Sequence, residues 1–290
     1  MRSLAPAVFV LIWSTGFLVG RGVSAHADAN LFLSLRFLAV AAIFAAAAVA
    51  ARAPWPRRPR QIGVQLAAGA LMSGLYLGAG WWAMEHGLPA GVMALLGALQ
   101  PIFTALVSVL FLRVRLGPTV WLGLAIGVAG VAMVLLPRLA AGSAGAEGMP
   151  GFPPLAVAAG MAGILSLTLG SMVQKSPLAA ADLRSASALQ SLGAAGVTAL
   201  LALALGTPRW DHSAALWGGF AWSVLVLSLG GTTLLIWLMR SGEATRTAAL
   251  LLLVPPLAAV QAWLLFGETL TAVQVAGFAL AIAGVALARR

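Results

Sequence analysis

The fold is decided by two uncharged stretches, PTVWLGLAIGVAGVAMVLL at residues 118–136 and AVQVAGFALAIAGVALA at residues 272–288. A shift of 154 residues superimposes them without a gap, so that Gly123 falls on Gly277 and Gly130 falls on Gly284. The same shift also pairs Gly16 with Gly170, Arg21 with Lys175, Pro101 with Pro255 and Leu116 with Leu270. The chain therefore reads as one unit that occurs twice.

The composition places both units in a lipid bilayer. Of the 290 residues, 61% are hydrophobic and 8% are charged, whereas a soluble domain carries about 25% charged residues. Each spanning helix needs about 20 apolar residues, so the length accommodates ten short-looped spans. The apolar runs predict an all-α integral membrane protein with spans at residues 4–23, 31–51, 63–84, 89–112, 118–136, 155–174, 183–205, 214–239, 244–266 and 272–288. We expect a first repeat over residues 1–139, a connecting loop over 140–154 and a second repeat over 155–290.

The odd number of spans in each unit determines how the repeats are related. Five spans carry the chain across the membrane, so the second unit must enter it in the opposite direction. Inverted repeats of this kind are typical of secondary transporters, whose central site is exposed to each side in turn. Duplication also produces scaffolds and channels, so the repeat alone does not separate these functions.

The basic residues predict the orientation. Most Lys and Arg residues fall in loops on one side of the spans, and the positive-inside rule makes that side, with both termini, cytoplasmic. Because the net charge of +10 comes from span ends rather than from a basic soluble segment, we expect no nucleic-acid partner. Arg2, the first apolar run and Ala25-His26-Ala27 imitate a secretory signal, but the first span belongs to the repeat and should be retained. We expect a multi-pass monomer in a bacterial-type inner membrane.

Several short motifs resemble the EamA-type family of the drug/metabolite transporter superfamily. They are Leu11-Ile12-Trp13-Ser14-Thr15-Gly16-Phe17, Leu35-Arg36-Phe37-Leu38, Gly91 to Pro101, Phe266-Gly267-Glu268-Thr269-Leu270, Gln274, Gly277 and Gly284. The resemblance covers nearly the whole chain and implies a ten-helix carrier of small metabolites, often an exporter. It also implies that spans one to four and six to nine surround a central cavity, while spans five and ten pack outside. The amino-acid exporters typified by YddG are one such branch, and no motif here separates them from other metabolite carriers.

Helix breaks at equivalent places point to a binding site. Pro101 lies near the middle of the fourth span, and Pro255 and Pro256 lie near the middle of the ninth. Proline removes an amide donor and disturbs the preceding turn, so nearby carbonyls lose helical partners and can face a solute or water. A packing kink stabilised by neighbouring helices is the alternative.

The polar and aromatic residues of the spans supply the candidate site. Gln100 lies on a semi-polar face of the fourth span, and Tyr76, the only tyrosine, shares a face of the third span with Gly80. We predict that the substrate contacts Trp13, Phe17, Tyr76, Gly80, Trp81, Met84, Gln100, Thr233 and Trp237. Interhelical hydrogen bonding and ordinary lipid-facing or core aromatics are the alternative explanations.

The acidic residues bear on energy coupling. All seven acids fall in loops or at span ends, so no mid-membrane carboxylate is predicted to cycle a proton, and uniport or solute exchange is favoured. Glu85 and His86 at a span end are the remaining route for protonation, or a simple interfacial pair. Arg36, the one charge well inside a span, can pair with helix-end carbonyls or extend toward the interface, and the family resemblance favours a structural anchor over a substrate ligand.

Other functions are less compatible with the sequence. Cysteine is absent, the three histidines lie near span ends, and no HExxH or GxGxxG motif occurs, so we expect neither an intramembrane enzyme nor a metal or cofactor. A channel would be expected to show rings of charge or a filter motif, and none is visible. Aromatic, thioether and hydroxyl groups without a central acid suit a neutral or zwitterionic small molecule, which predicts amino acids, with a hydrophobic drug or a sugar derivative as the alternative.

Overall fold

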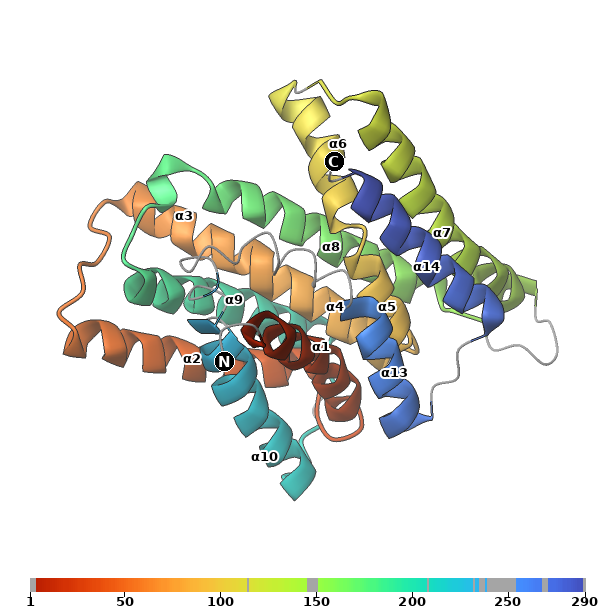
Figure 1. Cartoon of the computed structure of the whole chain (residues 1–290). Coiled ribbons are helices and arrows are strands. Elements are labelled where there is room, and N and C mark those ends of the chain that lie inside the picture. Colours follow the sequence, from red (N-terminus) through yellow and green to blue (C-terminus); the bar gives the residue numbers. More distant parts are fainter. Residues whose placement is uncertain are drawn as a thin grey trace.

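The computed structural model is all-helical in its long elements (Figure 1). It describes residues 4–113, 115–144, 151–207, 209–231, 233–234, 238, 254–267 and 271–288. The first half contains α1 (Ala5–Val23), α2 (Ala29–Ala50), α3 (Pro59–Gly69), η1 (Ala70–Leu75), α4 (Tyr76–Glu85), α5 (Ala90–Gly97), α6 (Gln100–Leu112) and α7 (Pro118–Ala144). The second half contains α8 (Pro154–Gln174), η2 (Pro177–Ala179), α9 (Leu183–Leu205), α10 (Ala214–Ala221), η3 (Trp222–Gly230), α13 (Val254–Phe266) and α14 (Ala272–Ala288).

The helices confirm an all-helical chain of ten apolar helices, while most of the end of the predicted eighth span and the start of the ninth lie outside the described residues. Within the described ranges, six are long and apolar enough to cross a membrane, and four shorter apolar helices complete the ten. One difference concerns α7, which continues through Pro137 to Ala144 and so runs into the predicted connecting loop. The residues after Pro137 are rich in alanine, which has the highest helix propensity and lets the helix continue.

The equivalent helices α7 and α14 show that the repeat is inverted. A Cβ added to Gly123 would lie 2.6 Å from the carbonyl oxygen of Gly284, and one added to Gly130 would lie 2.7 Å from that of Gly277. The earlier glycine of α7 therefore meets the later glycine of α14, and the later glycine of α7 meets the earlier one of α14. The two helices are antiparallel. Glycine is required at these crossings because any side chain would meet the backbone of the other helix.

A second equivalent pair, α2 and α9, has the same relation. Three hydrogen bonds mark its antiparallel course, joining Asp28 with Thr207 (3.1 Å), Ser34 with Thr198 (3.0 Å) and Ser185 with Pro54 (2.9 Å). Equivalent positions also carry π-helical turns, because the shift of 154 moves η1 onto residues 224–229, inside η3. The symmetry of the repeat thus extends to irregular parts of the backbone.

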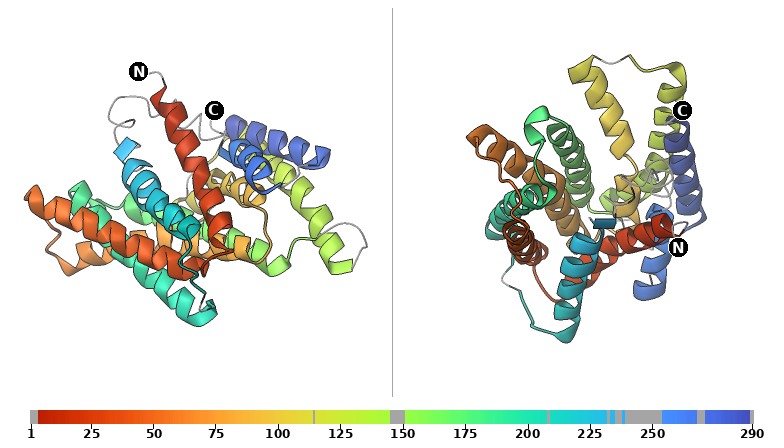
Figure 2. Two further views of the ribbon diagram at one scale, coloured as in Figure 1. Left: turned by 90° about the horizontal axis from the view of Figure 1, so that it is seen from below. Right: turned by 60° about the vertical axis from the view of Figure 1, so that its left-hand side comes forward.

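At one end of the molecule distant segments are joined by contacts, whereas at the other end the segments lie apart. We call the first the Asp28 end, which carries Asp28, Glu85, Arg209 and Trp210, and the second the basic end, which carries Arg52, Arg57, Arg58, Arg60, Arg113, Arg115 and Lys175. In Figure 1 the loop between α2 and α3 lies at the far left, whereas the end of α6 and the start of α7 lie at the top, and Figure 2 shows the same separation. These segments all belong to the basic end, so that end is splayed.

Contacts between distant segments close the Asp28 end. Ala27 forms an antiparallel bridge with Trp210, and Arg209 forms an ion pair with Glu85. Behind them Phe32, which is fully buried, packs its ring 5.6 Å from that of Trp81. The first half and the segment between α9 and α10 are therefore joined at this end by backbone, charge and aromatic contacts.

Candidate functional site

A central cavity of about 490 Å³ lies between the two halves. Its wall is formed by α1, α2, η1, α4, α5, α6, α8, α9, η3 and α13, with one residue, Val285, from α14. Cavities of roughly 300 to 1,000 Å³ are typical of sites for small molecules. The expectation that spans five and ten stay outside holds for α7, none of whose described residues lines the wall, but Val285 is a correction to it for α14.

Most of the predicted site residues lie in this wall. They are Trp13, Phe17, Tyr76, Gly80, Trp81, Met84, Gln100, Pro101 and Pro255. Pro256 is half-buried outside the wall, Thr233 is exposed, and Trp237 lies outside the described residues. Thr233 misses the wall because it follows η3, whose wider π-helical turns rotate later residues away from the face that α-helical spacing predicts.

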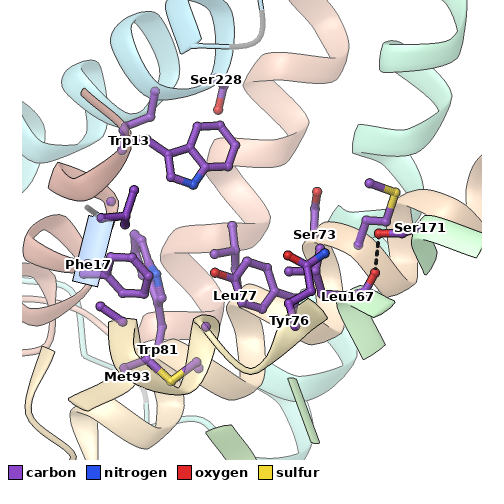
Figure 3. A pocket seen from close by; sticks show the side chains of 18 of the residues that line it. Trp13, Phe17, Ser73, Tyr76, Leu77, Trp81, Met93, Leu167, Ser171 and Ser228 are labelled. Carbon is purple, nitrogen blue, oxygen red and sulfur yellow. Dashed lines mark hydrogen bonds between the residues drawn. The ribbon is translucent and has the colours of Figure 1, made fainter. Parts of the chain in front are cut away.

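One side of the cavity is aromatic and contains sulfur. Figure 3 shows Trp13, Phe17, Trp81 and Met93 together on this side. Gly20 allows the arrangement, because a Cβ there would lie 2.5 Å from Met84 Cε and 2.9 Å from the Trp81 ring. This surface suits apolar groups, and Trp faces also attract ammonium groups.

The opposite side is polar and was missed by the sequence analysis. It contains Ser171, Ser187, Gln190 and Ser191 from α8 and α9. Gln190 donates both hydrogens of Nε2, one to Gln65 Oε1 (2.7 Å) and one to Gln174 Oε1 (2.9 Å). Three of these positions could have been predicted from the repeat. The shift of 154 places Ser171 at the position equivalent to Phe17, and Gln190 and Ser191 at the positions equivalent to Arg36 and Phe37.

The fourth span is interrupted where it meets the cavity. α5 ends at Gly97 and α6 begins at Gln100, and the amides of Ala98 and Leu99 bond three residues back instead of four (3.0 and 2.9 Å). Pro101 has no N–H to donate to the carbonyl of Gly97, which lines the cavity. Thr104, Ser108 and the wall residue Ser171 each donate to a backbone carbonyl of their own helix (2.8, 2.7 and 2.7 Å), so these hydroxyls have a partner without a ligand.

Arg36 contributes the only charge among the described residues of the wall. The side chain is 6% exposed, and its Nε and Nη2 donate to Ser228 Oγ at 3.2 and 3.0 Å. The guanidinium carbon lies 5.7 Å from the ring centroid of Phe37 and 5.9 Å from that of Trp81. The interpretation as an anchor is incomplete, because the side chain also faces the cavity.

The acidic groups at the Asp28 end are engaged in local structure. The Asp28 carboxylate accepts the amide of Leu31 at 2.8 Å and so caps α2. The amide of Ser213 and the ring of His26 lower the pKa of Asp211 to about 2. His86 stacks on Trp82 and bonds its carbonyl (2.8 Å), while Glu85 pairs with Arg209, so neither member of the predicted Glu85–His86 pair reaches the cavity wall.

Comparison with known proteins agrees with this architecture. The profile of the EamA-like transporter family matches residues 4–136 and 154–290. One solved crystal structure, described only as that of a protein, is 20% identical with a TM-score of 0.61, over 98% of this chain and 95% of the other. At this identity the likeness shows the fold alone. No curated protein gives a significant match.

Proposed function

The chain belongs to the EamA-like transporter family, and we propose that it carries small neutral or zwitterionic metabolites, specifically amino acids, out of the cell by alternating access. The observation that carries the proposal is the cavity itself. It is large enough for an amino acid, apolar on one side and polar on the other, and both halves of an inverted repeat contribute to it. This would place the protein near the YddG-like exporters.

The proposed state of the carrier is open at the basic end. The Asp28 end is held by the Arg209–Glu85 pair and the Ala27–Trp210 bridge, while the helices of the basic end diverge. With the basic end cytoplasmic by the positive-inside rule, a solute would enter from the cytoplasm. Reporter fusions test the orientation, and amino and carboxyl ends found on different faces of the inner membrane would contradict it.

Transport without proton coupling is the proposed energetics. Neither a carboxylate nor a histidine occurs among the described wall residues, so this part of the cavity has no side chain that titrates near neutral pH. We propose uniport or solute exchange by a monomer. A pH gradient alone should therefore drive no accumulation of substrate in proteoliposomes.

A counterflow screen in proteoliposomes tests the function. Labelled amino acids, sugars and cationic drugs are compared, and saturable uptake that is stimulated by unlabelled amino acid inside is the expected result. Linear, unsaturable flux would instead identify a channel. Stimulation only by sugars or drugs would overturn the choice of amino acids while leaving a carrier.

Tyr76→Ala tests the site. We expect flux to fall about tenfold or more, because truncating a large aromatic contact removes about 1.5 to 3 kcal/mol of apolar burial. Tyr76→Phe separates the ring from the hydroxyl, and Trp121→Ala, at a 45% exposed aromatic outside the wall, is the matched control. Normal flux in a folded Tyr76→Ala protein would contradict the assignment. Trp237 stays a prediction that the same assay can test.

A further inference from the structure

We propose that Arg36 binds a carboxylate of the transported molecule. The inference rests on the proposed function, which it narrows from small metabolites to molecules that carry a carboxylate group. It starts from the placement of a cation in a cavity wall that is otherwise neutral wherever the structure describes it.

The Arg36 guanidinium has N–H groups that its bonds to described residues do not use. Arginine carries five N–H groups, and the bonds to described residues use Nε and Nη2 on one oxygen, Ser228 Oγ. Nη1 has no protein acceptor in the described chain. A hydroxyl is also a weak partner for a cation, whereas a carboxylate can accept two parallel N–H bonds from the Nη1/Nη2 edge that Ser228 leaves open.

The surroundings provide no counter-ion. None of the described carboxylates lies within ion-pair distance of Arg36, and the described acids nearest the Asp28 end are occupied by Arg209, His26 and backbone amides. The rings of Phe37 and Trp81 lie beside the guanidinium, with centroids 5.7 and 5.9 Å from its carbon, and offer it no anionic partner. A buried, unpaired charge is costly, and charges inside membrane proteins usually serve function. A carboxylate that enters the cavity would provide the missing partner.

The repeat supplies an internal comparison. The shift of 154 places Gln190 at the position equivalent to Arg36, and it too lines the cavity. The neutral amide of Gln190 donates to Gln65 and Gln174, so the fold does not require a charged side chain at that position. Arg36→Gln therefore gives the first half the residue type that the second half already accommodates.

The experiment uses the full-length purified protein and competition binding. The probe is labelled leucine, and the competitors are leucine, leucinamide and 4-methylpentanoic acid, which keep or remove the carboxylate and the amine in turn. Wild type should prefer leucine over leucinamide by about tenfold to a hundredfold, because charge-assisted hydrogen bonds are about twice as strong as neutral ones. Arg36→Gln should abolish that preference, Arg36→Lys should keep part of it, and Lys175→Gln, which removes an exposed charge, should leave it unchanged.

The outcomes separate this inference from the proposed function. Equal binding of leucine and leucinamide to wild type, or a preference that survives in folded Arg36→Gln, overturns the role of Arg36 while amino-acid transport stands. If no amino acid binds but labelled 4-methylpentanoic acid binds in an Arg36-dependent manner, the carboxylate site stands and the substrate class fails. Chloride that competes as strongly as the carboxylic acid would also overturn the proposal. If Arg36→Gln does not fold, the preference for leucine over leucinamide is compared between wild type and Arg36→Lys, and an undiminished preference in Arg36→Lys overturns the proposal.

Discussion

The two halves of the cavity wall share a backbone and differ in chemistry. The shift of 154 relates wall positions in pairs, which are Trp13 and Leu167, Phe17 and Ser171, Arg36 and Gln190, Phe37 and Ser191, Ser73 and Leu227, Gln100 and Val254, and Pro101 and Pro255. The first half presents rings and a guanidinium in several places where the second presents hydroxyls and an amide. Under the proposed alternating access, the equivalent backbone would let the halves exchange conformations, and the unequal side chains would hold an asymmetric solute in one orientation.

The largest expected effect concerns the crossing of α7 and α14, where the two repeats match in both backbone and side chains. Gly123→Leu and Gly277→Leu should each prevent folding to a similar degree, because a Cβ at either position would lie within 2.7 Å of a carbonyl oxygen of the other helix. Overpacking of this kind costs about 1 to 3 kcal/mol even where side chains can move, and here the obstacle is backbone.

The measurement is the yield of monodisperse protein and its melting temperature in detergent. Gly218→Leu is the matched control, since a Cβ at this exposed helical glycine meets nothing within 4 Å. If one of the two buried glycines tolerated leucine as well as Gly218 does, the symmetric packing of α7 and α14 would be contradicted.

The wall itself should respond asymmetrically. Phe17→Ser removes an apolar group from the first half, and we expect apparent affinity for apolar amino acids to fall about tenfold to a hundredfold, equivalent to about 1.5 to 3 kcal/mol. Ser171→Phe places a ring in the polar side and should weaken binding of hydroxyl-bearing amino acids more than that of apolar ones. Competition against leucine and threonine measures both selectivities. A shift of selectivity in the same direction in both variants would show that the halves are not used differently.

The sequence was sufficient for features that depend on local composition and on spacing. The apolar runs located the helices, the shift of 154 identified the inverted repeat, and Pro101 marked an interruption that the backbone places between Gly97 and Gln100. Most of the predicted wall residues came from the first half, because their ring and thioether side chains stand out in an apolar helix.

Features that depend on long-range packing or on irregular turns were not predictable in the same way. Serines are common in spans as helix-packing residues, so Ser171 and Ser187 gave no signal of their own. Thr233 was predicted from α-helical periodicity that the π-helical turns of η3 interrupt. The role of Gly20 in seating Trp81 and Met84 depends on a contact between α1 and α4 that no local pattern contains.

A smaller expected effect concerns the two ends of the molecule. Leu33 and Ser187 are equivalent in the repeat, but Leu33 is fully buried near the Asp28 end, whereas Ser187 lines the cavity toward the basic end. Because the chain has no cysteine, Leu33→Cys and Ser187→Cys can each report labelling by a soluble maleimide without further changes. We expect fast labelling at position 187 and slow labelling at position 33, and equal rates would contradict a cavity that is open at one end.

Loss of the Arg209–Glu85 ion pair should slightly raise the accessibility of the Asp28 end. Glu85→Gln removes the partner of Arg209, whose side chain is 42% exposed, and a partly exposed pair contributes about 1 kcal/mol at most. Labelling at position 33 should therefore rise up to about fivefold in the Glu85→Gln background. Asp182→Asn is the control, since it removes a carboxylate at the basic end while keeping a side chain that caps α9. An equal rise with Asp182→Asn would mean that the Arg209–Glu85 pair is not part of the closure, and that aromatic packing around Phe32 holds the Asp28 end by itself.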